Sequence, residues 1–257
     1  MAQPAIRDSV ARLDVPPAPP QAARLEPFDS YWQAPDDVEK GYAKFEAYYR
    51  ANYLAHLPDE RDARILVVSC GAGYLVSLLK KEGYTDVAGI DSDPDKVAHG
   101  LKRGLPLETS PAFAYLEAMP GPYDVIIPEQ ELNHLTLDEQ IAFLRLARRN
   151  LKPGGLLMVY GLNGANPLVG SENLAHNVDH FNLFTDYSLK QVLKLGGFVN
   201  VKVMPLKLYV FWKNPLNYVG LAVTSVLELF FRACFVLYGK DVKVLSKKIA
   251  ATATNPG

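Results

Sequence analysis

Cysteine is scarce in this sequence, and so is any excess of charge of one sign. The 257 residues contain two cysteines, Cys70 and Cys234, far apart in the chain. A disulfide framework is therefore not expected, and the pattern suits a reducing cytoplasm. No Cys-x-x-Cys or Cys/His cluster indicates zinc. Basic and acidic residues number 27 and 28, so no global basic field points to a nucleic-acid partner.

The N-terminus also lacks the continuous apolar core of a signal peptide. Residues 1–27 are instead rich in proline and alanine, which predicts a flexible lead segment before one domain at 28–257. A domain of this length, in a chain with 49% apolar residues, can bury a sizeable core without disulfides.

An aromatic helix is expected between Asp36 and about Leu57. Tyr42, Phe45, Tyr49 and Tyr53 recur at steps of three and four residues, as on one face of a helix. Two interpretations stay open for this segment. It packs on the domain as an ordinary helix, or it forms a lid over a ligand, with Tyr48, Tyr49 or Arg50 reaching into the site.

From Ala63 onwards, strand and helix patterns alternate. Apolar runs predict strands at 65–69, 87–91, 123–129, 155–162 and 198–206. Helix starts are indicated by Asp93 before Pro94, by the Thr136/Glu139 pair, and by Thr185. This βαβαβ order predicts an α/β fold with a doubly wound, mostly parallel Rossmann-like sheet and helices on both faces.

A small-residue loop and an acidic residue stand where such a sheet binds ligands. The loop 69–73 (Ser-Cys-Gly-Ala-Gly) follows the first strand, and Asp91 ends the second, where an acid accepts hydrogen bonds from ribose hydroxyls. Val76 replaces the third glycine of a dinucleotide fingerprint, and no Gly-Lys-[Ser/Thr] follows the loop. This combination favours a ligand with one ribose and a small charged tail, such as S-adenosylmethionine (SAM).

Several ordered segments resemble class I SAM-dependent methyltransferases: 65–97, 123–135 and LARRNLKPGGLLMV at 146–159. The segments 161–170, 180–198 and 244–256 are similar to a branch associated with bacterial surface polysaccharides and other glycans. The resemblance implies that residues 247–253 form an antiparallel strand between the fifth and sixth strands. It also implies a cofactor site made from Ser69, Cys70, Gly71, Ala72, Gly73, Asp91, Ser92, Ser110 and Glu129.

Two positions depart from the family pattern. Val67 stands where the family usually has an acid that organises the loop and the methionine ammonium, and Ser110 stands near the place of an acid that faces the adenine. These changes leave open weaker SAM binding, a partner group supplied from elsewhere, or a SAM-binding scaffold without transfer activity.

Two histidines are the candidate catalytic residues. His134 follows the fourth strand and His180 precedes the late helix, both at the carboxyl edge of the expected sheet. Each is a candidate base for a hydroxyl acceptor or a structural residue of its loop. Glu129, Glu131 and Asp179 have no metal-specific spacing, so we predict no metal.

The segment 213–240 is an insertion before the last strand and carries a long apolar run. Glu228 and Arg232 lie within it at i and i+4, and Lys240, Lys243, Lys247 and Lys248 follow. The alternatives are a helix against a membrane surface or a second subunit, an ordinary core helix, and a transmembrane helix, which the central charges disfavour.

The sequence therefore predicts a cytoplasmic SAM-dependent methyltransferase, peripheral to the inner face of the membrane if 213–240 meets lipid. The main hypothesis is O-methylation of a glycan or glycan precursor. The alternative acceptor is a small phenol, acid or quinone precursor.

Overall fold

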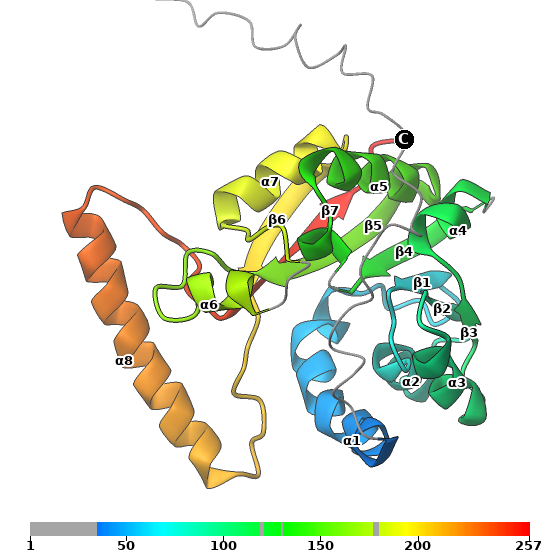
Figure 1. Ribbon diagram of the computed structural model, residues 1–257, viewed down its shortest axis with the longest axis horizontal. Coiled ribbons are helices and arrows are strands. Elements are labelled where there is room, and N and C mark those ends of the chain that lie inside the picture. The colour runs from blue at the N-terminus through cyan, green and yellow to red at the C-terminus, as the bar shows by residue number, and fades with distance from the viewer. Residues whose placement is uncertain (1–34, 119–120, 130, 177–179) are drawn as a thin grey trace, which may run out of the picture.

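The computed structural model describes residues 35–118, 121–129, 131–176 and 180–257 (Figure 1). The lead segment predicted at 1–27 lies outside these ranges. Along the chain, the elements are α1 (Pro35–Asn52), η5 (Leu54–His56), β1 (Ile65–Val68), α2 (Tyr74–Lys81), β2 (Val87–Asp91), α3 (Pro94–Lys102), β3 (Leu107–Thr109), α4 (Ala112–Ala118), β4 (Tyr123–Pro128), η6 (Glu131–His134), α5 (Leu137–Arg149), β5 (Leu151–Leu162), α6 (Gly170–Ala175), α7 (Asp186–Leu195), β6 (Val199–Pro205), α8 (Pro215–Leu237) and β7 (Lys248–Thr254).

Seven strands form one sheet in the order β3-β2-β1-β4-β5-β7-β6. The strands β3, β2, β1, β4 and β5 pair in parallel, and β7 runs antiparallel between β5 and β6. This arrangement confirms the predicted fold class. Strand β7 begins one residue later than the expected antiparallel strand, and β5 begins four residues earlier than expected, at Leu151.

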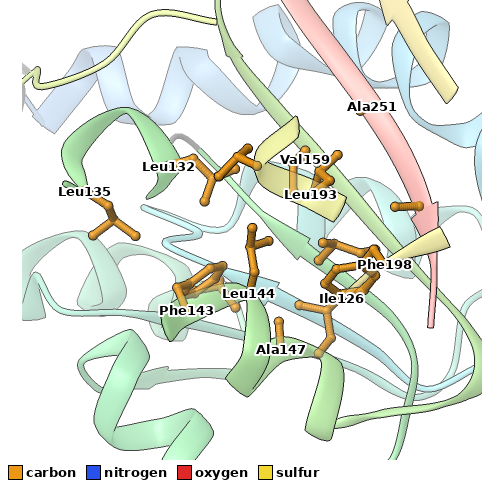
Figure 2. Packing of buried hydrophobic residues seen from close by; sticks show 14 of the residues in the cluster. Ile126, Leu132, Leu135, Phe143, Leu144, Ala147, Val159, Leu193, Phe198 and Ala251 are labelled. Atoms are coloured by element: carbon orange, nitrogen blue, oxygen red, sulfur yellow. The ribbon is translucent and has the colours of Figure 1, made fainter. Parts of the chain in front are cut away.

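Both faces of the sheet are covered, which explains why β1 is apolar at every position. Leu66 and Val68 point into the cluster under α4, α5 and α7 that Figure 2 shows, whereas Ile65 and Val67 point into the cluster beneath α1 and α2. All four side chains are fully buried. A continuous apolar run is the pattern of a strand between two helical layers.

Side-chain caps begin the helices where the sequence indicated. The Asp93 side chain accepts hydrogen bonds from the backbone N–H groups of residues 95 and 96. Thr136 with Glu139 and Thr185 with Ser188 form reciprocal capping boxes at the starts of α5 and α7. These local bonds satisfy N–H groups that have no partner inside the helix.

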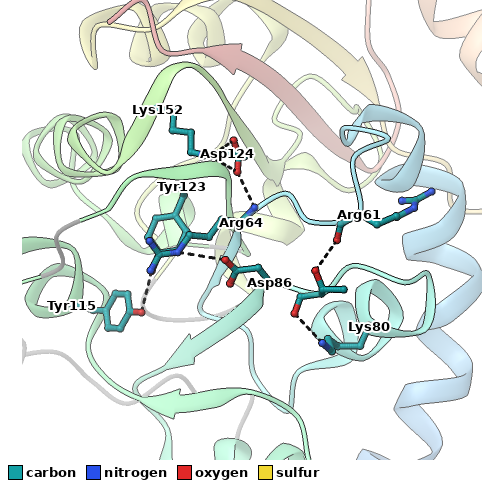
Figure 3. A network of polar contacts seen from close by, with 9 residues as sticks. Arg61, Arg64, Lys80, Asp86, Tyr115, Tyr123, Asp124 and Lys152 are labelled. Carbon is teal, nitrogen blue, oxygen red and sulfur yellow. Dashed lines mark hydrogen bonds and ion pairs between the residues drawn. The ribbon is translucent and has the colours of Figure 1, made fainter.

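A charged network ties the amino ends of the central strands together (Figure 3). Asp124 at the start of β4 accepts a hydrogen bond from the backbone of Arg64 at 2.8 Å and from Lys152 Nζ at 2.8 Å. The Arg64 guanidinium lies 4.7 Å from the centre of the Tyr123 ring. These charges lie at the edge opposite the carboxyl ends of the strands, so their contacts hold the sheet together and do not face its ligand edge.

Helix α8 joins β6 to β7 through two connectors, 206–214 and 238–247. Figure 1 shows it standing apart from the sheet, beyond α6. Because β5 and β6 both run antiparallel to β7, this long excursion leaves and re-enters the sheet at the carboxyl edge.

Candidate active site

The loop after β1 turns sharply because three of its residues adopt positive φ. Ser69, Gly71 and Gly73 have φ values of 55°, 56° and 80°. A Cβ at Gly73 would come within 2.9 Å of the Leu107 side chain, whereas a Cβ at Gly71 would meet no atom within 4 Å. Gly73 therefore permits close packing of the turn, and the open side of Gly71 allows a ligand to approach the backbone.

Asp91 is fixed in place by backbone donors from two loops. Its Oδ2 accepts a hydrogen bond from Gly71 N at 2.7 Å, and its Oδ1 accepts one from Asp93 N at 2.9 Å. Its carbonyl accepts a bond from Ser110 N at 2.9 Å, and Ser92 beside it is exposed. The structure thus gathers the predicted residues Gly71, Asp91, Ser92 and Ser110 at neighbouring strand ends.

Two of the predicted loop residues turn inward. The Cys70 side chain is 4% exposed, and burial raises the pKa of its thiol far above its ordinary value. Its sulfur fills the space that Gly89 leaves, because a Cβ there would lie 2.9 Å from Cys70 Sγ. Ala72 is also buried and its carbonyl accepts a hydrogen bond from the Tyr42 hydroxyl at 2.5 Å. Cys70 and Ala72 therefore offer a ligand their main chain only.

Helix α1 packs on the domain, as the first interpretation predicts, and it contacts both the loop and the end of β4. Tyr42 bonds the loop, while the Tyr49 hydroxyl donates a 2.8 Å hydrogen bond to Glu129 Oε2. Arg50 points elsewhere: it pairs with Glu46 at 3.1 Å and Glu82 at 2.7 Å. Of the three residues that the lid interpretation named, Arg50 is therefore held by two carboxylates at the surface.

Glu129 is a buried carboxyl group at the end of β4. It is 8% exposed, and its backbone N–H donates to the carbonyl of Val68 at 2.8 Å. Burial raises the pKa of Glu129 to about 7, although the Tyr49 hydrogen bond and the positive charge of Lys248 act in the opposite direction. A cation entering the site would favour the ionised form of this group.

Two further groups lie around Glu129: Tyr48, one of the residues that the lid interpretation named, and Lys248, whose proximity to Glu129 the sequence did not predict. The buried Tyr48 hydroxyl has no hydrogen-bond partner among the described residues. Lys248 places its Nζ 5.1 Å from the centre of the Tyr160 ring and faces the charge of Glu129. In the sequence, Lys248 is the last of the lysines that follow the apolar run; in the structure it begins β7, and its charge acts on Glu129.

The candidate bases His134 and His180 lie side by side. Their ring centroids are 4.9 Å apart, and His180 Nδ1 lies 2.7 Å from the carbonyl oxygen of Asn173 in α6. His134 comes from η6 after β4, and His180 comes from the loop before α7. The tertiary fold therefore joins two histidines that the sequence could place only at the same sheet edge.

An asparagine clamp holds this histidine pair together. Asn133 is 1% exposed; its Nδ2 donates to the carbonyl of Asn182 at 2.7 Å, and its carbonyl accepts from Phe181 N at 2.9 Å. Its Oδ1 accepts from Leu162 N at 3.3 Å. Asn182 in turn donates to the carbonyl of Leu135. No periodic pattern marks these residues, and only their position next to the histidines could have drawn attention to them.

No cluster of three or more histidine, cysteine, aspartate or glutamate side chains arises where the structure describes side chains. Asp179 and the Glu131 side chain, two of the three acids considered for a metal, lie outside that description.

The residues fit SAM on three observations. The open face of Gly71 allows close approach, Asp91 is positioned for hydroxyl donors, and the Glu129 carboxyl with the unpaired Tyr48 hydroxyl can receive polar, cationic groups. Val67, in place of the expected acid, is fully buried with α1 side chains. Glu129, at the end of the neighbouring strand β4, is the carboxyl group that can take the place of this acid.

A family model described as a methyltransferase domain matches residues 42–203, more than half of the chain. A ubiquinone biosynthesis O-methyltransferase of Xylella fastidiosa is 31% identical over 142 residues, which are 53% of this chain and 56% of that protein. The chain thus spans about half the length of the curated relatives it matches.

Solved structures share the fold at lower identity. A SAM-dependent methyltransferase from Archaeoglobus fulgidus has a TM-score of 0.60 and 19% identity, covering 84% of this chain and 94% of its own. A phosphoethanolamine N-methyltransferase 2 of Haemonchus contortus, in complex with SAM, has a TM-score of 0.57 and 15% identity, covering 91% and 61%.

Proposed function

The chain belongs to the methyltransferase-domain family and is a class I SAM-dependent methyltransferase; from that premise we propose that it O-methylates a small aromatic acceptor with a phenolic hydroxyl. Relatives named for ubiquinone biosynthesis support this acceptor class, which was the alternative hypothesis from the sequence. Nothing in the comparisons supports the glycan acceptor that the sequence favoured.

The proposed SAM site has three parts. Asp91, held by Gly71 N and Asp93 N, accepts the ribose hydroxyls. The backbone of Gly71 borders the ligand on its open side. Glu129 receives the methionine ammonium, which compensates for the acid missing at Val67, and the Tyr48 hydroxyl supplies a further polar contact.

When bound, SAM supplies an electrophilic methyl group on a sulfonium that leaves as a neutral thioether. The protein has then to align the acceptor oxygen and take its proton. Alignment alone is worth an effective molarity of about 10⁵ M or more in well-oriented cases. The His134–His180 pair receives the hydroxyl proton, with the Asn173 carbonyl orienting His180 through Nδ1.

The observation that carries the acceptor proposal is the apolar character of exposed residues next to the histidine contacts in the chain. Leu174 follows Asn173, whose carbonyl contacts His180, and Phe181 follows His180 itself; their exposed fractions are 40% and 58%. Leu168, shortly before α6, and Tyr187, in the first turn of α7, are also exposed. A sugar would need polar partners for its several hydroxyls. An aromatic ring with a reactive hydroxyl suits exposed apolar residues next to a histidine pair.

Transfer of a labelled methyl group from SAM tests the proposal. The purified full chain is offered an alkyl-substituted catechol, the corresponding dimethoxy compound, and a nucleotide sugar. We expect a methyl ether on the catechol and no product from the dimethoxy control, which has no free hydroxyl. Methylation of the nucleotide sugar with an unmodified catechol would overturn the acceptor assignment in favour of the glycan hypothesis.

A further inference from the structure

Helix α8 leaves almost its whole surface exposed. It is the one helix of the described part of the chain that is long and apolar enough to cross a membrane, and none of its apolar window is buried. Within α8, Asn217 alone is buried. With 23 residues it is about 34 Å long. Proteins rarely expose so large an apolar surface without a binding partner.

The most exposed apolar side chains of α8 gather on one side of the helix. Seven apolar side chains that are more than half exposed lie within one half of the helix circumference and form what we call the apolar face: Val219, Val223, Val226, Leu229, Phe230, Val236 and Leu237. The polar stripe, on the other side, consists of Asn217, Thr224, Ser225, Glu228 and Arg232. No charged residue of α8 interrupts the apolar face.

The polar stripe faces the connectors of α8. The Asn217 side chain accepts a hydrogen bond from Phe211 N at 3.0 Å. Arg232 donates to the carbonyl of Lys243 at 2.8 Å, so the returning chain runs beside the end of the helix. Arg232 is therefore bound to the protein's own chain, and the apolar face lies on the other side of the helix.

Both ends of α8 carry aromatic and basic side chains. Trp212, Tyr218 and Tyr238 are 55%, 53% and 85% exposed. The connectors contain one acid, Asp241, and five lysines: Lys207, Lys213, Lys240, Lys243 and Lys247. Amphipathic aromatic rings and lysines are the residues that settle at the boundary between lipid and water.

The connectors are anchored to the ligand edge of the domain. Asn52 of α1 exchanges two hydrogen bonds with the backbone of Lys207, at 3.0 and 2.7 Å. Asn163, at the end of β5, donates to the carbonyls of Val244 and Ser246 at 3.0 and 2.8 Å. Whatever α8 binds is consequently held next to the catalytic edge.

These anchors exclude a transmembrane crossing. Only six residue steps separate Tyr238 from the anchored Val244, and a fully extended chain of that length reaches about 21 Å. The hydrocarbon core of a bilayer is about 30 Å thick. The far end of a spanning helix could not be reached from the domain, and Lys240 and Asp241 would lie within the core.

We propose that α8 is an interfacial helix that lies flat on an anionic lipid bilayer. Its apolar face enters the boundary of the acyl chains, and the flanking lysines meet anionic headgroups. A second copy of the chain is the less suitable occupant: both ends of α8 are basic, so pairing two such helices in either direction brings lysines against lysines. This inference rests on α8 and its anchors and is independent of the proposed acceptor.

Flotation of the full chain with vesicles tests the proposal, using neutral phosphatidylcholine vesicles and vesicles containing about 30% phosphatidylglycerol. We expect the protein to float with the anionic vesicles and to float several-fold less in about 1 M salt, which screens the lysine attraction. Val226→Asp, on the apolar face, should weaken flotation at least tenfold. Ser225→Asp adds the same charge one residue away, on the polar stripe, and should float like the wild type.

Tryptophan fluorescence gives a second measurement. Trp32→Phe leaves Trp212 as the sole tryptophan, whose emission should shift to shorter wavelength and be quenched by brominated lipid. SAM binding and methyl transfer to a water-soluble acceptor should be equal in wild type and Val226→Asp, which separates this test from that of the function. Absence of flotation, or equal flotation of both aspartate variants, overturns the proposal. A dimer that Val226→Asp dissociates without any effect of vesicles also overturns it and assigns the face to a second copy.

Discussion

Glu129→Gln is expected to remove a pH-dependent contribution to stability. The replacement keeps the shape of the side chain and an oxygen that can accept from Tyr49, but it cannot ionise. In the folded wild type, burial raises the pKa of Glu129 from 4.5 to about 7. Between these two pH values the folded state keeps a proton on Glu129 that the unfolded state has lost. The free energy of unfolding is therefore highest, as far as Glu129 is concerned, below pH 4.5, and it decreases as the pH rises to about 7.

The pKa difference sets the size of the effect. About 2.5 units at 1.36 kcal/mol per unit give roughly 3 kcal/mol as the upper limit of the free energy that Glu129 costs above pH 7. The free energy of unfolding of the Gln variant, relative to the wild type, should therefore rise by up to that amount between pH 4.5 and 8. Other titrating groups are common to both proteins and cancel in the comparison.

Urea unfolding without SAM, followed by circular dichroism at several pH values between 4.5 and 8, measures this difference. Glu117→Gln, an exposed carboxyl on α4, is the control and should stay parallel to the wild type. Calorimetry extends the test to the ligand: SAM should bind the wild type more tightly as pH rises to 8, and the Gln variant should lose this dependence. Parallel stability curves for the wild type and Glu129→Gln would refute the reasoning.

Three further substitutions probe the rest of the site. Asp91→Ala removes the ribose acceptor and should weaken SAM binding by about ten- to a hundredfold with an unchanged circular dichroism spectrum; equal affinity in calorimetry would remove Asp91 from the site. His180→Asn should reduce turnover by about 10²-fold or more and spare SAM binding; if turnover is unchanged, the base is His134, tested likewise. Asn133→Ala leaves buried partners unsatisfied and should lower the free energy of unfolding by about 1–3 kcal/mol, with a larger loss of turnover than of SAM affinity; a loss confined to stability would contradict its positioning role.

Local sequence patterns were sufficient for most of the fold. Buried parallel strands need continuous apolar runs, and the helix starts need Asp93, Thr136 and Thr185, so both are visible within a few residues. The cofactor half of the site was equally accessible, because the glycine loop and Asp91 must follow consecutive parallel strands. Their ribose-binding role is still a prediction.

The acceptor half of the site depended on contacts between distant segments. Tyr49 meets Glu129 across 80 residues, and His134 meets His180 through the asparagine clamp. Neither pair has a spacing rule, because the meeting point is set by how α1 and the loop before α7 cross the sheet edge. A sequence pattern could place these groups at the same edge but could not choose their partners.

The segment 213–240 shows the same division most clearly. Its apolar length and flanking lysines are properties of the sequence alone, and they are compatible with core, membrane surface or membrane span. Only the tertiary structure leaves α8 uncovered, turns Lys248 towards Glu129, and anchors both connectors at the ligand edge. Hydrophobicity determines that a surface must leave water, whereas chain connectivity and the reach of a short connector determine where it can go.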